Sequence, residues 1–296
     1  MTADHTDIRI GTIAQATEGV NYLRQIIPHG FESFELSFPP DLEGMDLNAL
    51  ASDVKACLDE FGNTAVISSL GVYGNPLQDE KAVHAWETLI DRAPAFGCDL
   101  VCGFTGRIAD KPIPESLPAF KRVFGELAKR AAGKGIRLAF ENCDMGGTWE
   151  YGNWNIAHSP HAWEMMFHEL PDANLGLEWE PCHQMNSLVD PLPQLRKWVH
   201  KIVHLHGKDA TVLHDVVREY GIRGGKTYVY HRTPGFGDSN WTDIISMLRL
   251  GGFKGAIDIE GWHDPVYRDA LEMTGQVHAL NYLKQCRGGD CVPNPT

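Results

Sequence analysis

Short apolar and β-branched runs alternate with longer helical patterns over nearly the whole chain. The runs lie at residues 8–13, 31–38, 64–70, 99–105, 136–143, 174–180, 202–206 and 255–261. Near-continuous apolar runs of this length are typical of parallel strands that are covered on both faces. The pattern therefore predicts eight buried β-strands.

Apolar residues between the runs recur at helical spacing. Leu47, Leu50, Val54, Leu58 and Phe61 form one stripe along a predicted helix. Further helices are predicted at residues 83–96, 117–131, 159–167 and 241–250. Eight strands, each followed by a helix, predict an α/β fold: a single (β/α)8 TIM barrel with eight parallel strands, forming one domain over residues 1–296.

Two details refine this expectation. A doubly wound open sheet is the structural alternative, but it would require a GxGxxG motif after an early strand, and the sequence has none there. The last crossover is longer than the others. Its segment "GGKTYVYHRTPGFGDSNW" predicts an extra loop or a short hairpin at the barrel mouth.

Acidic and imidazole side chains follow the last four predicted strands. In a TIM barrel the chemistry lies at the carboxyl ends of the strands. These ends carry Glu141, Glu178 or Glu180, His206 and Glu260. A carboxylate at the end of a buried strand is unfavourable unless it is paired or binds a cation. For any one of these residues a solvated acid or a packing histidine is the commoner role, but their coincidence at four consecutive strands predicts a divalent-metal site.

Strand periodicity does not choose between Glu178 and Glu180, because both project to the same side of a strand. The neighbouring His204 and His206 are expected to face opposite layers, one the barrel lumen and the other the helices.

Charge and composition narrow the class of partner. The chain of 296 residues has 39 acidic residues against 26 Lys and Arg, a formal net charge of −13. This balance argues against nucleic acid and against an anionic membrane surface, and it favours a small-molecule substrate. The first residues show no secretory signal, and no run approaches the roughly 20 apolar residues of a membrane span. Seven cysteines without a CxxC pair predict a reduced, cytoplasmic protein.

Five motifs together resemble a known family. They are "FEN", "GLEWEPCHQ", "HLHGKD", "HRTPGFGDSNW" and "GAIDIEGWHDP". With them the chain resembles the xylose isomerase-like TIM-barrel superfamily over roughly residues 30–283, and within it the sugar phosphate isomerase/epimerase branch that includes the ketose 3-epimerases. That resemblance implies one Mn²⁺, Co²⁺ or Mg²⁺ held by a Glu, an Asp, a His and a Glu.

Carried onto this sequence, the implied metal ligands are Glu141, Glu180, His206 and Glu260. Glu180 is preferred over Glu178 because Glu180-Pro-Cys-His matches the family's Asp-Pro-Ser-His. It departs from the family by one methylene group. Glu178 then becomes a deeper residue that requires its own partner, with Lys208 as one candidate. A hard, oxygen-rich ligand set favours Mn²⁺, with Mg²⁺ or Co²⁺ as alternatives.

The resemblance also implies an activity. We expect a metal-dependent carbohydrate isomerase or epimerase that works by proton transfer through a metal-stabilised enediolate. Glu141 and Glu260 would be the catalytic acid/base residues, and His183, Arg232 and Lys208 would bind the substrate. The loop "CDMGGTWEYGNWN" is expected to form a substrate lid. The expected substrate is an unphosphorylated sugar or keto-sugar.

Other functions remain open at this point. The main alternative is a metal-dependent lyase of 3-oxo-glycosides, like the C-glycoside deglycosidase subunits, which would work with a small partner subunit. A DNA-repair enzyme like endonuclease IV would require more histidine ligands and a basic face. A non-catalytic sugar-binding barrel would follow if Glu180 marks a lost metal site. Because family members are often dimers or tetramers, a homo-oligomer is also expected.

Overall fold

Eight parallel strands form a closed barrel in the computed structural model, which describes residue 5 and residues 7–295. Around the barrel the order is β1-β10-β7-β6-β5-β4-β3-β2. The strands are β1 (Ile8–Gln15), β2 (Ser33–Phe38), β3 (Val66–Val72), β4 (Leu100–Gly103), β5 (Arg137–Glu141), β6 (Leu175–Trp179), β7 (Ile202–Gly207) and β10 (Gly255–Ile259). Each predicted strand is present, so the predicted (β/α)8 fold is confirmed.

The chain divides into two compact units, which are described separately. The amino-terminal unit comprises residues 13–179 and 201–204, and the carboxyl-terminal unit comprises residues 1–12, 180–200 and 205–296. Residues 1–4, 6 and 296 lie outside the described residues. The expectations of one domain over residues 1–296 and of no secretory signal at the amino terminus fall partly on them and stay predictions.

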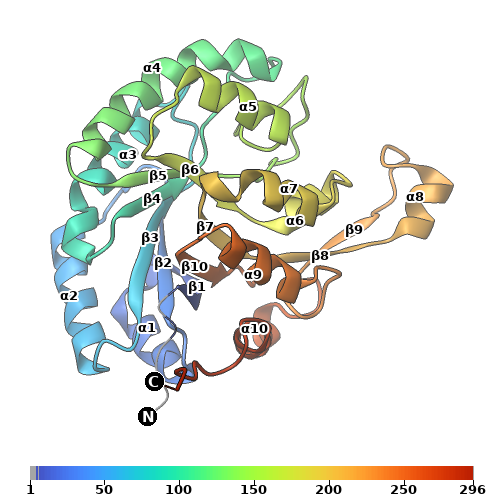
Figure 1. Cartoon of the computed structure of the whole chain (residues 1–296). Coiled ribbons are helices and arrows are strands. Elements are labelled where there is room, and N and C mark those ends of the chain that lie inside the picture. The colour runs from blue at the N-terminus through green and yellow to red at the C-terminus, as the bar shows by residue number, and fades with distance from the viewer. Residues whose placement is uncertain (1–4, 6, 296) are drawn as a thin grey trace. The chain divides into compact units, whose positions relative to one another are not determined.

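In the amino-terminal unit, β2 to β6 pair in chain order and helices cover their outer side (Figure 1). The helices are α1 (Val20–Ile26), α2 (Leu47–Glu60), α3 (Glu80–Arg92), α4 (Ile113–Ala132) and α5 (Pro160–Glu169), with short 3-10 turns η1 (Ala16–Glu18), η2 (Ile27–His29) and η3 (Ala93–Phe96). The start of α2 is fixed by Asp46, whose carboxylate accepts hydrogen bonds from the backbone N–H groups of Asn48 and Ala49. Ser159 caps α5 in the same way.

The helices of this unit pack on the strands through aromatic side chains. Phe124 of α4 contacts Trp86 of α3, Phe120 of α4 and Phe140 of β5 at ring-centroid distances of 5.3, 5.3 and 4.9 Å. All four side chains are fully buried. The apolar stripes seen in the sequence thus form the layer between helices and strands.

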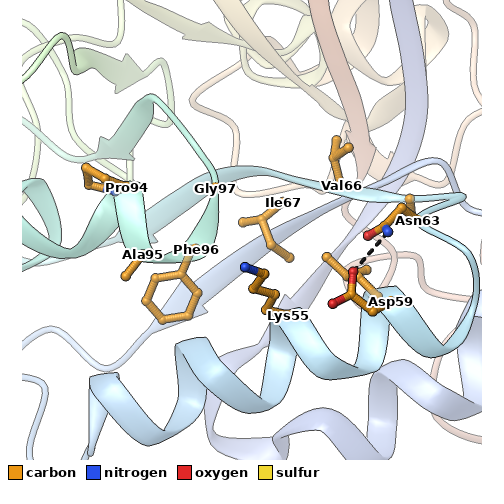
Figure 2. A pocket seen from close by; sticks show the side chains of 11 residues that line it. Lys55, Asp59, Asn63, Val66, Ile67, Pro94, Ala95, Phe96 and Gly97 are labelled. Atoms are coloured by element: carbon orange, nitrogen blue, oxygen red, sulfur yellow. Dashed lines mark hydrogen bonds between the residues drawn. The ribbon is translucent and has the colours of Figure 1, made fainter.

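A surface pocket of this unit lies between α2 and η3 (Figure 2). It is lined by Lys55 and Asp59 of α2, by Val66 and Ile67 at the start of β3, and by the turn 94–97 before β4. These are the amino-terminal ends of the strands, opposite to the ends that carry chemistry in this fold. Asp59 accepts a hydrogen bond from the side chain of Asn63, so the acid in the pocket has a local structural partner.

In the carboxyl-terminal unit, β10 pairs with β1 on one side and β7 on the other. Its helices are α6 (Pro181–Asn186), α7 (Pro191–Trp198), α8 (His214–Tyr220), α9 (Trp241–Leu250) and α10 (Glu272–Cys286), with η4 (Val199–Lys201) and η5 (Asp269–Leu271). An antiparallel hairpin, β8 (Asp209–Val212) with β9 (Val229–Arg232), carries α8 at its far end (Figure 1). The segment for which an extra loop or a short hairpin was predicted thus supplies one strand of this hairpin, β9, while the other strand, β8, lies before it in the chain. Among the described residues, no helix is long and apolar enough to cross a membrane.

The aromatic layer gives a first prediction. Phe124→Ala removes a fully buried ring, and we expect the free energy of unfolding to fall by about 3–5 kcal/mol. Urea denaturation measures the change. The control is Leu250→Ala, at a side chain that is 78% exposed, which should shift stability by less than about 0.5 kcal/mol. Equal effects of the two variants would contradict the packing described here.

Candidate active site

Three predicted metal ligands come together in the carboxyl-terminal unit. Glu180 follows β6 and precedes α6, His206 lies in β7, and Glu260 directly follows β10. Their ligand atoms all lie within 4.8 Å of one another, and all three side chains are buried. β7 and β10 are neighbours, with His206 opposite Asp258, so the parallel register brings the two strand ends to the same edge.

The two carboxylate oxygens of Glu260 have different surroundings. Oε1 lies 2.9 Å from Lys208 Nζ and 2.8 Å from His263 Nε2. Oε2 lies 3.5 Å from His206 Nδ1 and makes no hydrogen bond with any residue that the structure describes, although it is buried. Burial acts to raise the pKa of Glu260, but Lys208, His263 and His206 outweigh it and lower the pKa to about 2. Glu260 is therefore an ionised carboxylate with one open oxygen.

Glu180 also lies near the ammonium group of Lys208, which contacts Glu260. Lys208 Nζ lies 3.9 Å from Glu180 Oε2, and His183 Nε2 lies 3.0 Å from Oε1. The Cys182 thiol donates a hydrogen bond of 3.2 Å to Oε2. Burial acts to raise the pKa of Glu180, but Lys208 and His183 hold it well below its ordinary value. Lys208 is only 3% exposed, so it is an internal cation that balances two buried carboxylates.

This arrangement fits a divalent metal. Carboxylate oxygens with one imidazole are the donors that Mn²⁺, Mg²⁺ and Co²⁺ accept. The buried Oε2 of Glu260 is a donor atom of that kind that makes no hydrogen bond with the described residues. A buried oxygen in that state is unfavourable unless it binds something else.

Glu141, the remaining predicted ligand, belongs to the amino-terminal unit. It is the last residue of β5, is 5% exposed and lies opposite Glu178 of β6 in the strand register. Asn155 holds the end of β5, because its side-chain amide donates to the backbone carbonyls of Glu141 and Cys143, at 2.8 Å each.

A second polar cluster lies inside the amino-terminal unit and was not anticipated from the sequence. His204 Nδ1 lies 2.8 Å from Glu178 Oε1 and 3.6 Å from Glu35 Oε2. The Tyr73 hydroxyl donates to both carboxylates, and the Ser69 hydroxyl donates to Glu35. Burial, together with Glu178 and Glu35, raises the pKa of Tyr73, so its hydroxyl stays protonated and donates. Glu178 thus finds partners in His204 and Tyr73.

The expectation that His204 and His206 face opposite layers is wrong. His204 contacts acids of both β2 and β6, which only a side chain in the barrel interior can do. His206 contacts the strand-end carboxylate of Glu260. Residues two apart along a strand project to the same side, and this periodicity should have been applied to the pair.

The predicted substrate-binding residues lie on short segments of the carboxyl-terminal unit. His183 is on α6, 4% exposed, and its ring nitrogens make no hydrogen bond with any described residue. Arg232 ends β9, and its Nε donates to Asp264 Oδ2 at 3.0 Å. Between His183 and the loop after β10 lies His231, which the sequence reasoning passed over although it adjoins Arg232 in the motif "HRTPGFG".

The loop after β5, expected to be a lid, is held by a buried arginine. Arg107 is fully buried and donates to the backbone carbonyls of Thr148, Trp149 and Lys111. A Cβ at Gly152 would lie 2.7 Å from the Arg107 guanidinium, which explains why this position has no side chain. Any lid motion is therefore confined to the parts of the loop outside the residues that Arg107 holds.

The family follows from the match of its model to most of the chain. The model of the xylose isomerase-like TIM barrel matches residues 23–286. The chain belongs to this family. The resemblance found in the motifs is thereby confirmed, and the family's members include carbohydrate epimerases and isomerases and a dehydratase.

Individual relatives are distant. An inosose dehydratase of Clostridium perfringens is 30% identical over 125 residues, which is 40% of this chain and 40% of the dehydratase. A 3-keto-D-glucoside 4-epimerase from E. coli is 17% identical with a TM-score of 0.70, covering 94% of this chain and 100% of that one. A xylose isomerase-like protein from Mycobacterium smegmatis, in complex with magnesium, is 17% identical with a TM-score of 0.70, covering 97% and 100%. At this identity the structural matches show the fold alone.

The internal cation gives a prediction for the metal-free protein. Lys208→Met leaves Glu180 and Glu260 without their shared cation, so we expect the free energy of unfolding to fall by about 3–5 kcal/mol in chelator-containing buffer. The pKa of Glu260 should rise, because Lys208 is the strongest influence that lowers it. Urea denaturation and a ¹³C NMR titration of the carboxyl groups measure the two changes.

The matched control for Lys208 is Lys121→Met, which removes an exposed ion pair with Glu169. Its effect on unfolding should stay below about 1 kcal/mol. A Lys208→Met protein as stable as the wild type would show that the two carboxylates do not depend on this lysine.

Proposed function

We propose that the protein is a divalent-metal-dependent isomerase or epimerase of a sugar or keto-sugar. The observation that carries this proposal is the buried group of Glu180, His206 and Glu260, in which Glu260 keeps one oxygen open. Membership in a family of carbohydrate-modifying enzymes supports the substrate class. We propose Mn²⁺ as the metal, an unphosphorylated substrate, a cytoplasmic location and a homo-oligomeric state.

Glu141 is proposed as the fourth ligand. It ends β5, which neighbours β6 in the barrel order, and parallel strands bring their carboxyl ends to the same edge. Glu141, Glu180, His206 and Glu260 then come from four consecutive strands of the barrel, β5, β6, β7 and β10. Such a ligand set matches the one implied by the sequence motifs.

The proposed acid/base residues are Glu141 and Glu260. A bound divalent metal would supply Lewis acidity, which makes a C–H group next to a carbonyl easier to deprotonate. A carboxylate can also accept that proton only through an oxygen that is accessible to the substrate. In Glu260 this is Oε1, where the contact with His263 is the one that a substrate can displace, because His263 is 45% exposed whereas Lys208 is buried.

The remaining residues would hold the substrate. His183 directs Nε2 to Glu180, while its Nδ1 makes no hydrogen bond with the described residues, and Arg232 is oriented by its bond to Asp264. Lys208 keeps both carboxylates ionised and lies close enough to Glu260 to stabilise negative charge on a neighbouring substrate oxygen. Proton return to the opposite face gives epimerisation, and return to the adjacent carbon gives isomerisation.

A second candidate is a lyase or dehydratase reaction. Removal of the same proton can be followed by loss of a β-oxygen substituent, as water or as the aglycone of a 3-oxo-glycoside. The 30% identical segment shared with an inosose dehydratase favours this option. If the protein is a 3-oxo-glycoside lyase, we also propose that it works with a small partner subunit.

Metal binding tests the first part of the proposal. Isothermal titration of the chelator-treated protein with Mn²⁺ should show one ion per chain, and His206→Gln should weaken binding by at least about 10-fold. His200→Gln, at an exposed histidine shortly before β7, is the control and should bind like the wild type. A wild-type protein that binds no divalent ion would refute the metal-dependent function.

Proton exchange tests the second part. The Mn²⁺-loaded protein is incubated in D₂O with D-fructose, D-psicose, scyllo-inosose and a 3-oxo-glucoside, and NMR follows deuterium incorporation and product. We expect incorporation next to the carbonyl, and a loss of about 10²–10⁴-fold in Glu141→Gln. Glu126→Gln, at an exposed acid on α4, is the control. Release of water or aglycone would select the lyase alternative, and full activity of Glu141→Gln would refute its acid/base role.

A further inference from the structure

Three imidazoles form an arc between the two carboxylates of the carboxyl-terminal unit. His183 Nε2 lies 3.0 Å from Glu180, and His263 Nε2 lies 2.8 Å from Glu260. His231 lies between them, with ring centroids 5.1 Å from His183 and 6.1 Å from His263, both edge-to-face. Lys208 contacts both of these carboxylates. The three histidines, the two carboxylates and Lys208 thus form one group of side chains that contact one another.

We propose that His231 is a further substrate-contacting residue, whose ring N–H donates a hydrogen bond to an oxygen of the bound sugar or keto-sugar. This inference rests on the proposed function and adds a residue to it.

The hairpin places His231 against the helix that carries His183. His231 of β9 lies opposite Ala210 of β8 in the antiparallel register. Ala210 packs with Cys182 and Met185 of α6, and Val212 and Val229 of the hairpin pack against this cluster. Because α6 also carries His183, this apolar contact sets the spacing of the two rings.

A second anchor ties the other side of β9 to the loop after β10. The Asp264 carboxylate accepts hydrogen bonds from Arg232 Nε at 3.0 Å and from the backbone N–H of Thr233 at 2.9 Å. It also accepts hydrogen bonds from the backbone N–H groups of Val266 and Tyr267 in its own loop. Asp264 follows His263 directly, so this anchor fixes His231 relative to His263.

The ring of His231 itself remains open. It makes no hydrogen bond with any residue in the part of the chain that the structure describes, and it is only half-buried. Polar side-chain atoms that are removed from water normally have a hydrogen-bond partner, in the protein or in ordered water. The ring of His231 is fixed by two anchors, and its nitrogens are unused beside the proposed metal-binding cluster. We infer that they serve to bind a ligand.

The charge state suits hydrogen bonding to a neutral or anionic oxygen. Burial, followed by Lys208 and His183, lowers the pKa of His231 to about 4. The imidazole is therefore neutral at pH 7, and one ring nitrogen carries a proton while the other accepts. A neutral imidazole held in this way can polarise a substrate carbonyl without giving up its proton.

The experiment compares His231→Phe, which keeps ring packing without a donor, with His231→Asn, which keeps an N–H donor. The Mn²⁺-loaded variants are assayed for deuterium exchange in D₂O with D-fructose, D-psicose, scyllo-inosose and the 3-oxo-glucoside. We expect kcat/KM to fall by at least about 10-fold in His231→Phe and by less in His231→Asn. His214→Phe, at an exposed histidine of α8, is the control and should leave kcat/KM unchanged. Melting temperature and Mn²⁺ affinity should match the wild type in all three variants.

The other outcomes overturn the inference in distinguishable ways. Unchanged kcat/KM in His231→Phe, with an active wild type, removes the substrate contact and leaves the proposed function standing. Weaker Mn²⁺ binding or a lower melting temperature, in proportion to the lost activity, assigns His231 a metal-binding or packing role instead. A wild type that neither binds Mn²⁺ nor exchanges deuterium with any of the four compounds refutes the proposed function and the inference together.

Discussion

The buried cation of Lys208 is the interaction on which the carboxyl-terminal unit depends. Two ionised carboxylates, Glu180 and Glu260, are removed from water, and each would shift to its neutral form without a nearby positive charge. Lys208 prevents this, with its Nζ 2.9 Å from one carboxylate and 3.9 Å from the other. It leaves Oε2 of Glu260 open, because the lysine occupies Oε1. The protein can therefore fold with these carboxylate oxygens already charged, which is the state in which carboxylates bind a divalent metal.

The amino-terminal unit also contains buried carboxylates, and there hydroxyl donors and an imidazole stabilise them. The interior of a TIM barrel is usually filled by branched apolar side chains. Here Glu35 and Glu178 occupy interior positions, and Ser69, Tyr73 and His204 supply their hydrogen bonds. A Cβ at Gly71 would lie 2.5 Å from Glu35 Oε1, so the neighbouring strand also makes room for this carboxylate. Such a network is stable only when each member is paired, which restricts substitution at all of these positions.

The sequence predicts the parts of this structure that repeat and misses those that depend on contacts between distant segments. The strands and helices follow from apolar periodicity, which is local. The ends of strands locate Glu141, His206 and Glu260, because the fold places all such ends at one edge. Glu180 could be separated from Glu178 only by the motif around it, since both share a face. Tyr73 had no local signal, because its partners lie on β2 and β6. His231 adjoins Arg232 in the motif "HRTPGFG", but the histidines that it contacts lie on α6 and in the loop after β10.

The proposed metal ligands lie at the strand ends of the barrel, whereas most of the proposed substrate-binding residues lie on the hairpin and α6. This separation affects which reaction would follow proton removal. In the proposed reaction, the strand ends supply the carboxylates that would bind a metal and accept the proton, and epimerisation, isomerisation and elimination can all begin with these steps. The outcome depends on which substrate oxygens are held and where a proton is available afterwards. The residues proposed here for those contacts, His183, His231 and Arg232, lie on α6 and the β8–β9 hairpin. Asp264 and the apolar contact with α6 fix the hairpin at two points, and neither contact involves Glu180, His206 or Glu260. Under the proposed function, the hairpin is therefore the element in which substrate specificity would vary independently of the proposed metal ligands.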